Sequence, residues 1–162
     1  MITAAIRNVE LVPVAGEDRA FLFQVFATTR ERELAFAPWS DEQKQDFLRM
    51  QFEAQDRDYR SNYPQAQFLL IREEGDPIGR IYLDRRQDEI RILDIALLPE
   101  HRGRGIGSQL LSAVHAQAAA AGLAVRLHVE HYNLARQLYE RMGYRVLSDD
   151  GVYLFMECFP CS

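Results

Sequence analysis

Apolar positions along the chain follow two spacings, which predict strands and helices in alternation. Short apolar or alternating runs, typical of strands, occupy 4–12, 68–71, 78–83, 90–97, 122–130 and 153–156. Apolar residues three and four apart, typical of helices, occupy 17–29, 41 to about 59 and 133–143. A further helix is predicted where Leu110, Leu111 and Val114 recur at this spacing, and it ends near Gly122. The predicted order is β-α-α-β-β-β-α-β-α-β-β, in which one further strand, without assigned bounds, lies between the last helix and the closing strand 153–156. This order predicts an α/β (α+β) protein with a mixed sheet of about seven strands.

Local signals place several ends of these elements. Ser40 followed by acidic residues predicts a capped helix start, and Pro64 ends that helix. The segment 74–77 is rich in turn-forming residues and predicts a hairpin connection. Asn133 is expected to cap the last helix and Gly143 to end it.

Length and composition favour one soluble domain over residues 1–162. The chain has 162 residues, of which 48% are hydrophobic, enough for a sizeable core. It contains no apolar run near the roughly 20 residues that a membrane helix needs, so a cytoplasmic protein without membrane contact is expected. The net charge of −5 and the scattered basic residues argue against nucleic-acid binding.

Cys158 and Cys161 form a C-x-x-C pair near the end of the chain. A redox pair is expected at a helix start, and a zinc site needs two further ligands, which no second pair supplies. Reduced thiols and no metal are therefore predicted.

The most informative segment is the glycine-rich turn Arg102-Gly103-Arg104-Gly105-Ile106-Gly107-Ser108 between an apolar strand and a helix. The first N–H groups of a helix lack intrahelical partners, and the helix dipole places partial positive charge there. Glycines let an anion approach the backbone, and Arg102 and Arg104 add charge. The segment therefore predicts a phosphate site.

Spacing separates three kinds of phosphate turn. A P-loop needs a lysine before Ser or Thr, and none precedes Ser108. The dinucleotide pattern G-x-G-x-x-G is missed because Gly103, Gly105 and Gly107 lie two residues apart. The remaining pattern, R-x-x-G-x-G, resembles the pyrophosphate-binding motif of the GNAT superfamily, the acyl-CoA-dependent N-acyltransferases. The segment 133–144 also resembles that family's N-x-x-A-x-x-L-Y-x-x-x-G-F/Y, one residue shorter between Asn133 and Ala135.

The resemblance implies a GNAT fold whose sheet opens into a V between its fourth and fifth strands, with acetyl-CoA as co-substrate in the V. It implies transfer of an acetyl group to a primary amine of a small molecule or peptide by direct attack. The backbone of Ile95, Ala96 and Leu97 would bind the pantetheine arm, and Arg102, Gly103, Arg104, Gly105, Ile106, Gly107 and Ser108 would bind the diphosphate. Asn133 either bonds near the acyl end or serves only as a helix cap.

The same resemblance places Tyr139 near the thioester sulfur, where a phenol can donate a proton to the departing thiolate. The general base stays open between His128, Asp94 and a relay through water from Glu130 and His131 at the strand end. The family's position for a base falls on His128 when the motif is aligned at Asn133. It falls on Leu127 when the motif is aligned at Tyr139, because the segment is one residue shorter. Neighbouring residues of a strand point to opposite faces, so the choice depends on which face of the sheet lines the V. Asp94 is expected among apolar neighbours, where a carboxylate becomes easier to protonate.

The resemblance also implies that the first two helices and the loop between them, about residues 29–46, line the acceptor side. There Arg30 and Arg32 are candidates for binding an acidic group, and Trp39 for covering the acceptor or for packing alone. A catalytically silent acyl-CoA-binding or protein-interaction module on the same fold is the alternative function. A homodimer through 152–156 and an edge covered within one chain both explain the last strand.

Overall fold

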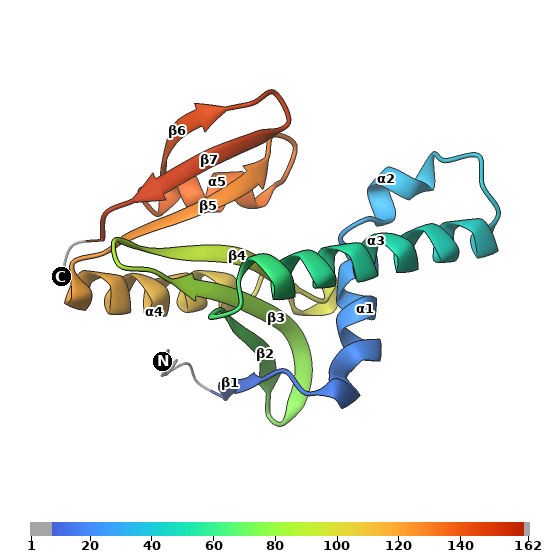
Figure 1. The fold of residues 1–162 in the computed structure, drawn as a ribbon, viewed down its shortest axis with the longest axis horizontal. Coiled ribbons are helices and arrows are strands. Elements are labelled where there is room, and N and C mark those ends of the chain that lie inside the picture. The colour runs from blue at the N-terminus through green and yellow to red at the C-terminus, as the bar shows by residue number, and fades with distance from the viewer. Residues whose placement is uncertain (1–7, 161–162) are drawn as a thin grey trace.

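The computed structural model describes residues 8–160, which form a sheet with helices on both faces (Figure 1). The strands are β1 (Val9–Pro13), β2 (Gln67–Glu73), β3 (Asp76–Arg85), β4 (Glu89–Leu97), β5 (Ala124–Glu130), β6 (Arg145–Asp149) and β7 (Tyr153–Cys158). The α-helices are α1 (Arg19–Thr28), α2 (Glu31–Ala35), α3 (Asp41–Asn62), α4 (Ile106–Ala121) and α5 (Ala135–Arg141), and short 3-10 turns cover Gly16–Asp18 and Pro99–His101.

The seven strands lie in the order β1-β2-β3-β4-β5-β7-β6. Neighbouring strands pair antiparallel except β4 and β5, which are parallel. A parallel pair needs a crossover connection, and α4 supplies it between β4 and β5. The mixed seven-stranded sheet of the predicted GNAT fold is thereby confirmed.

The parallel pairing of β4 with β5 is short, so the sheet opens beside it. Residues 89–92 of β4 pair with 124–127 of β5, yet β4 continues for five more residues, to Leu97. A bulge against β3 falls at Leu93, where the pairing with β5 stops. Bulges bend a strand and increase its twist, which directs the two strands apart. The predicted V between the fourth and fifth strands is confirmed.

A buried ionic network holds the closed end of this V together. Glu89, with 2% of its surface exposed, accepts hydrogen bonds from Arg86, Arg91 and Arg126. The Arg126 guanidinium also donates to Glu157 of β7 at 2.8 Å. Because each buried carboxylate has guanidinium partners, the network joins β4, β5 and β7 without an unpaired charge.

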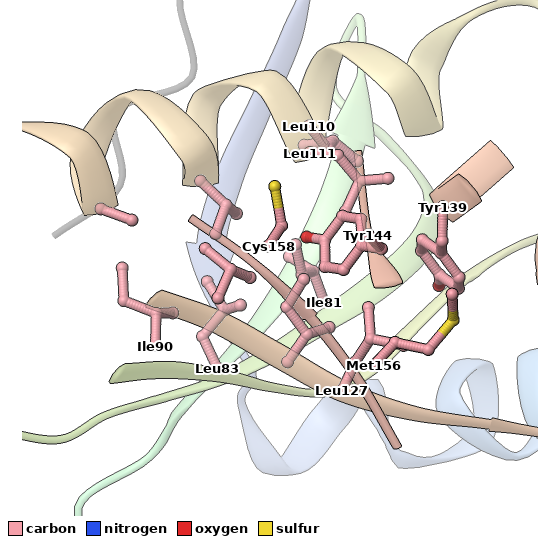
Figure 2. Packing of buried hydrophobic residues seen from close by; sticks show 14 of the residues in the cluster. Ile81, Leu83, Ile90, Leu110, Leu111, Leu127, Tyr139, Tyr144, Met156 and Cys158 are labelled. Atoms are coloured by element: carbon pink, nitrogen blue, oxygen red, sulfur yellow. The ribbon is translucent and has the colours of Figure 1, made fainter. Parts of the chain in front are cut away.

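Apolar side chains form one core on each face of the sheet. The larger core lies between the sheet and the helices α4 and α5, and Figure 2 shows Leu110, Leu111, Tyr144 and Leu127 within it. The smaller core joins α1 and α3 to β2 through residues such as Phe26, Phe52 and Leu70. The two faces of the sheet are therefore covered by different helices.

Several element ends differ from the sequence prediction. Residues 4–7 of the predicted first strand lie outside the described residues, and the observed strand is Val9–Pro13. The short helix α2 was not predicted, and α3 continues to Asn62, beyond the expected end near Tyr59. The helix α5 begins at Ala135, after a cap residue Leu134, whereas Gly143 takes the left-handed φ of +95° expected after a helix end.

Cys158 lies in the larger core, while Cys161 lies outside the described residues. Between residues 8 and 160, no group of three or more His, Cys, Asp or Glu side chains is placed to hold a metal ion. Within the same span, no helix combines the length and apolar character that crossing a membrane requires.

Gly79 allows β3 and β4 to approach at the end of the V. A Cβ at this position would collide with the carbonyl oxygen of Ala96, whereas a Cβ at Gly16 would meet no atom within 4 Å. We expect Gly79→Ala to lower the free energy of unfolding by about 1–3 kcal/mol, because the backbone of β4 must move. Chemical denaturation measures this, with Gly16→Ala as the matched control. Equal stability of the two variants would contradict the close approach.

Candidate active site

The glycine-rich turn lies where β4 ends and α4 begins. Gly103 and Gly105 have φ values of +73° and +81°, a region that L side chains rarely adopt. Gly105 is the N-cap residue of α4 and has no side chain to bond the first N–H groups of the helix. The turn geometry therefore requires glycine at both positions, and it leaves the start of α4 uncapped.

The backbone of this turn forms an open set of donors. From Gly103 to Ser108, no backbone N–H group donates a hydrogen bond to another described residue. A Cβ on Gly103 or Gly105 would meet no atom within 4 Å, so space lies in front of the backbone. Unpaired N–H groups at the positive end of a helix dipole are suited to the oxygens of a diphosphate.

The two arginines of the turn are already engaged with the protein. Arg102 Nε donates to the carbonyl of Leu97 at 2.9 Å, and Arg104 donates to both carboxylate oxygens of Glu73 at 3.1 and 3.3 Å. The Leu97 carbonyl oxygen has two lone pairs, of which Arg102 engages one, so the role of Leu97 toward the pantetheine arm stays a prediction. Free strand edge beyond the β5 pairing remains at Ile95 and Ala96, neither of which pairs with β5.

Tyr139 lies on α5 and belongs to the larger core. Its side chain packs against Tyr144, with ring centroids 5.5 Å apart, and Figure 2 shows Met156 extending toward it. Only 6% of the residue is exposed, and its hydroxyl makes no hydrogen bond to another described residue. Burial raises the pKa of Tyr139, and the carboxylates of Asp94 and Glu130 raise it further. The hydroxyl therefore stays protonated at neutral pH and is a free hydrogen-bond donor.

The structure separates the two registers that the sequence left open on β5. Leu127 is buried in the larger core with Tyr139, whereas His128 points to the opposite face and is exposed. The His128 ring stacks on Phe155, with centroids 4.6 Å apart. Burial lowers the pKa of His128, and the guanidinium of Arg91 lowers it further, so the imidazole is neutral at pH 7.

Asp94 lies on β4, on the same face of the sheet as His128, but its surroundings differ from the expected apolar ones. The carboxylate oxygen Oδ2 accepts a hydrogen bond from Arg80 Nε at 2.6 Å. About a quarter of the side chain, 26%, is exposed. Asp94 is thus a partly exposed carboxylate in an ion pair with Arg80. The expectation that apolar side chains surround this carboxylate is wrong.

The candidate acceptor residues lie around α2, which projects beyond the sheet with the first part of α3 (Figure 1). Arg30 lies 3.6 Å from Glu33 and over the ring of Phe26. Trp39 packs edge-on against Phe47, with centroids 5.0 Å apart, which agrees with a packing role. Arg32 is exposed on α2. Their roles toward an acceptor stay predictions.

Asn133 follows β5 and links the strand end to α5. Its Oδ1 accepts a hydrogen bond from the N–H of Ala135 at 2.9 Å, and its Nδ2 donates to Glu130 at 2.9 Å. The first of these bonds satisfies a free N–H at the start of α5, as a cap does. Asn133 therefore bonds the start of α5 as a cap residue does, although the N-cap position itself is Leu134.

A contact that the sequence did not predict joins the loop after β5 to the helix α2. The hydroxyl of Tyr132, in the loop after β5, donates to Glu33 of α2 at 2.8 Å, and this bond raises the pKa of Tyr132 to about 12. The two residues are 99 positions apart, so no local spacing signals their contact. Arg80 and Tyr59 were missed for the same reason, since only the fold brings them to Asp94.

The fold and the turn together define a mixed sheet that opens where its parallel strand pair separates, with backbone N–H groups that bond no other described residue at the start of the helix that follows. Residues 27–144 match the model of the acetyltransferase (GNAT) family. The chain belongs to this family. Family membership supports acetyl transfer from an acyl-CoA.

Solved structures share the whole fold at low sequence identity. The PaiA N-acetyltransferase from Thermoplasma acidophilum, in complex with coenzyme A, is 24% identical, with a TM-score of 0.70 over 93% of this chain and 98% of that one. Ard1 from Thermoplasma volcanium is 17% identical, with a TM-score of 0.65 over 96% of this chain and 100% of that one. An acetyltransferase from Thermus thermophilus is 20% identical, with a TM-score of 0.64 over 94% and 96% of the two chains. At these identities the likeness concerns the fold.

Proposed function

We propose that this protein transfers the acetyl group of acetyl-CoA to a primary amine of a small molecule or peptide, by direct attack of the amine on the thioester. One combination of features supports the proposal: the backbone N–H groups from Gly103 to Ser108 have no partner among the described residues, and the buried Tyr139 hydroxyl is protonated and donates to none of them. Both features serve the same donor, because a diphosphate and a thioester are parts of one CoA ester.

Residues of the turn and of β4 would hold the donor. The N–H groups from Gly103 to Ser108 suit the diphosphate, and the edge of β4 at Ile95 and Ala96 suits an extended pantetheine amide, which would pair like an added strand. Arg104 can contribute charge once a diphosphate competes with Glu73 for its guanidinium.

Acetyl transfer moves one proton from the nucleophile to the leaving group. The amine nitrogen bonds to the carbonyl carbon, the carbon–sulfur bond breaks, and the thiolate takes a proton. Tyr139 is the donor of that proton in this proposal, since its hydroxyl is protonated and free. The amine loses its proton to one of the two candidate bases, the exposed His128 or the partly exposed Asp94.

The acceptor would enter beside α2, where Arg30 lies 3.6 Å from Glu33, the residue that Tyr132 contacts, with Arg32 and Trp39 as the further candidates. Arg30 is balanced by Glu33, so the entrance does not select an acidic acceptor through a free Arg30. A neutral or cationic amine is the acceptor that this charge balance favours.

The proposal is tested by release of free thiol from acetyl-CoA in the presence of a panel of amines, amino acids and peptides. We expect at least one amine to accelerate release, with an N-acetylated product identified by mass spectrometry. Tight CoA binding with no acceleration by any amine would favour the silent acyl-CoA-binding module instead.

A further inference from the structure

A buried guanidinium lies directly behind the carboxylate of Asp94. Arg80 of β3 has 3% of its surface exposed. Its Nε donates to Asp94 Oδ2 at 2.6 Å, and its Nη2 donates to Gln55 Oε1 of α3 at 2.9 Å. The guanidinium also faces the ring of Tyr82, with its central carbon 4.9 Å from the centroid. Arg80 is therefore fixed from two directions.

An ion pair of this kind contributes little to the stability of a fold. Desolvation of two charges offsets most of their attraction, and an apolar pair of similar volume often stabilises a fold equally well. Although burial opposes it, the Asp94 carboxylate keeps the pKa of Arg80 raised, so the guanidinium is permanently charged. The pair therefore places a fixed positive charge behind a carboxylate that still reaches the V.

Only one of the two carboxylate oxygens of Asp94 is bonded by Arg80. Asp94 Oδ1 makes no hydrogen bond to another described residue, and 26% of the side chain is exposed. Asp94 lies on the part of β4 beyond Ile92, where the pairing with β5 has ended, so it belongs to the strand segment at the opening between β4 and β5. Burial raises the pKa of Tyr139 of α5 and of Tyr59 of α3, and the Asp94 carboxylate raises both further.

Other groups hold the strand segment that carries Asp94. The Tyr59 hydroxyl donates to the carbonyl of Leu93 at 3.3 Å, at the bulge of β4. The Tyr59 ring packs edge-on against Tyr82, with centroids 5.5 Å apart. The helix α3 thus supports both the backbone before Asp94 and, through Gln55, the guanidinium behind it.

We propose that Arg80 is a positioning residue for acetyl transfer: it fixes Oδ2 of Asp94, so that Oδ1 accepts an N–H of the acceptor amine inside the V. This inference rests on the proposed function and deepens it, because it selects Asp94 over His128 as the group that meets the nucleophile. Gln55 has the supporting role of fixing Arg80.

The proton movements balance within this arrangement. As the amine nitrogen bonds to the carbonyl carbon it becomes positively charged, and Oδ1 of Asp94 stabilises that charge and accepts its proton. The carbon–sulfur bond breaks, and the thiolate takes the hydroxyl proton of Tyr139. The proton on Asp94 then returns to the Tyr139 oxygen, so both side chains end in their starting states, with amide and free CoA thiol as products.

The test compares steady-state kinetics of the full chain with the best amine of the panel for wild type, Arg80→Gln, Arg80→Lys and Gln55→Ala. We expect Arg80→Gln to lower kcat/KM for the amine by about tenfold or more, with the KM for acetyl-CoA within about twofold of wild type. Arg80→Lys restores part of the loss, since it keeps a charge behind Asp94. Gln55→Ala gives a smaller loss, of about threefold.

Arg86→Gln is the matched control for loss of a bonded arginine. Arg86 also donates to two carboxylates, those of Asp84 and Glu89, but at the closed end of the sheet. We expect this variant to lower the melting temperature without changing kcat/KM for the amine. Asp94→Asn keeps the side-chain shape and is expected to lose at least about tenfold in kcat/KM, whereas His128→Gln loses less than Asp94→Asn.

The outcomes separate the two proposals. A wild type that transfers acetyl to no amine overturns the proposed function and this inference with it. An active wild type with a folded Arg80→Gln variant of unchanged kcat/KM for the amine overturns only the inference. If Arg80→Gln does not fold, Gln55→Ala decides: an unchanged kcat/KM for the amine overturns the role of Arg80, and a selective loss supports it.

Discussion

Replacing Tyr139 with phenylalanine is expected to lower kcat by about ten- to a thousandfold and to leave CoA affinity within about twofold of wild type. The substitution removes a hydroxyl that makes no hydrogen bond to another described residue, so the core loses little. The departing thiolate, however, loses its proton donor. Steady-state kinetics and calorimetric titration with CoA measure the two quantities separately.

Tyr144→Phe is the matched control for this substitution. Tyr144 is buried in the same core, and its ring contacts that of Tyr139, but its hydroxyl bonds His115 Nε2 at 2.7 Å. We expect Tyr144→Phe to reduce stability by about 0.5–1.5 kcal/mol and to leave kcat unchanged. Equal losses of kcat in both variants would show that the core, and not the Tyr139 hydroxyl, governs turnover.

Gly105→Asp is expected to weaken CoA binding by about 10- to 100-fold. A carboxylate at the start of α4 would face the diphosphate, and two unit charges a few ångströms apart near a protein surface repel by about 1–3 kcal/mol. The space in front of Gly105 admits the side chain, so the effect comes from charge and from the left-handed backbone. Calorimetric titration with CoA measures it.

Gly105→Asn separates charge from backbone strain. Asparagine has the shape of aspartate, carries no charge and tolerates the left-handed region. We expect it to retain CoA affinity within about fivefold of wild type, the strain being shared by both variants. Equal weakening by Asp and Asn would place the cause in the backbone, and equal wild-type affinity in both would contradict a diphosphate at this turn.

The fold followed from the sequence because its signals are local. Apolar spacing marks most of the strands and helices, and Gly103 and Gly105 mark a turn whose left-handed backbone other residues rarely adopt. The short helix α2 escaped because five residues do not establish a helical period. The extension of α3 to Asn62 escaped because its last turn carries few apolar residues, so its packing and not its pattern fixes the end.

The candidate site was predictable only in part. The phosphate turn and Tyr139 lie in short motifs, whereas the surroundings of Asp94 depend on Arg80, which the pairing of β3 with β4 brings alongside. The face of His128 likewise depended on which side of β5 meets α4. Long-range pairing decides such contacts, and one chain's sequence contains no local signal for them.

We expect the opening between β4 and β5 to receive an acyl-CoA, with its diphosphate at the turn from Gly103 to Ser108. The most direct measurement is an amide ¹H–¹⁵N correlation spectrum of the protein during titration with CoA. We predict that the amide signals of Gly103, Gly105 and Gly107 shift most, together with those of Ile95 and Ala96. Binding whose largest shifts fall elsewhere, with these glycine amides unmoved, would contradict the account.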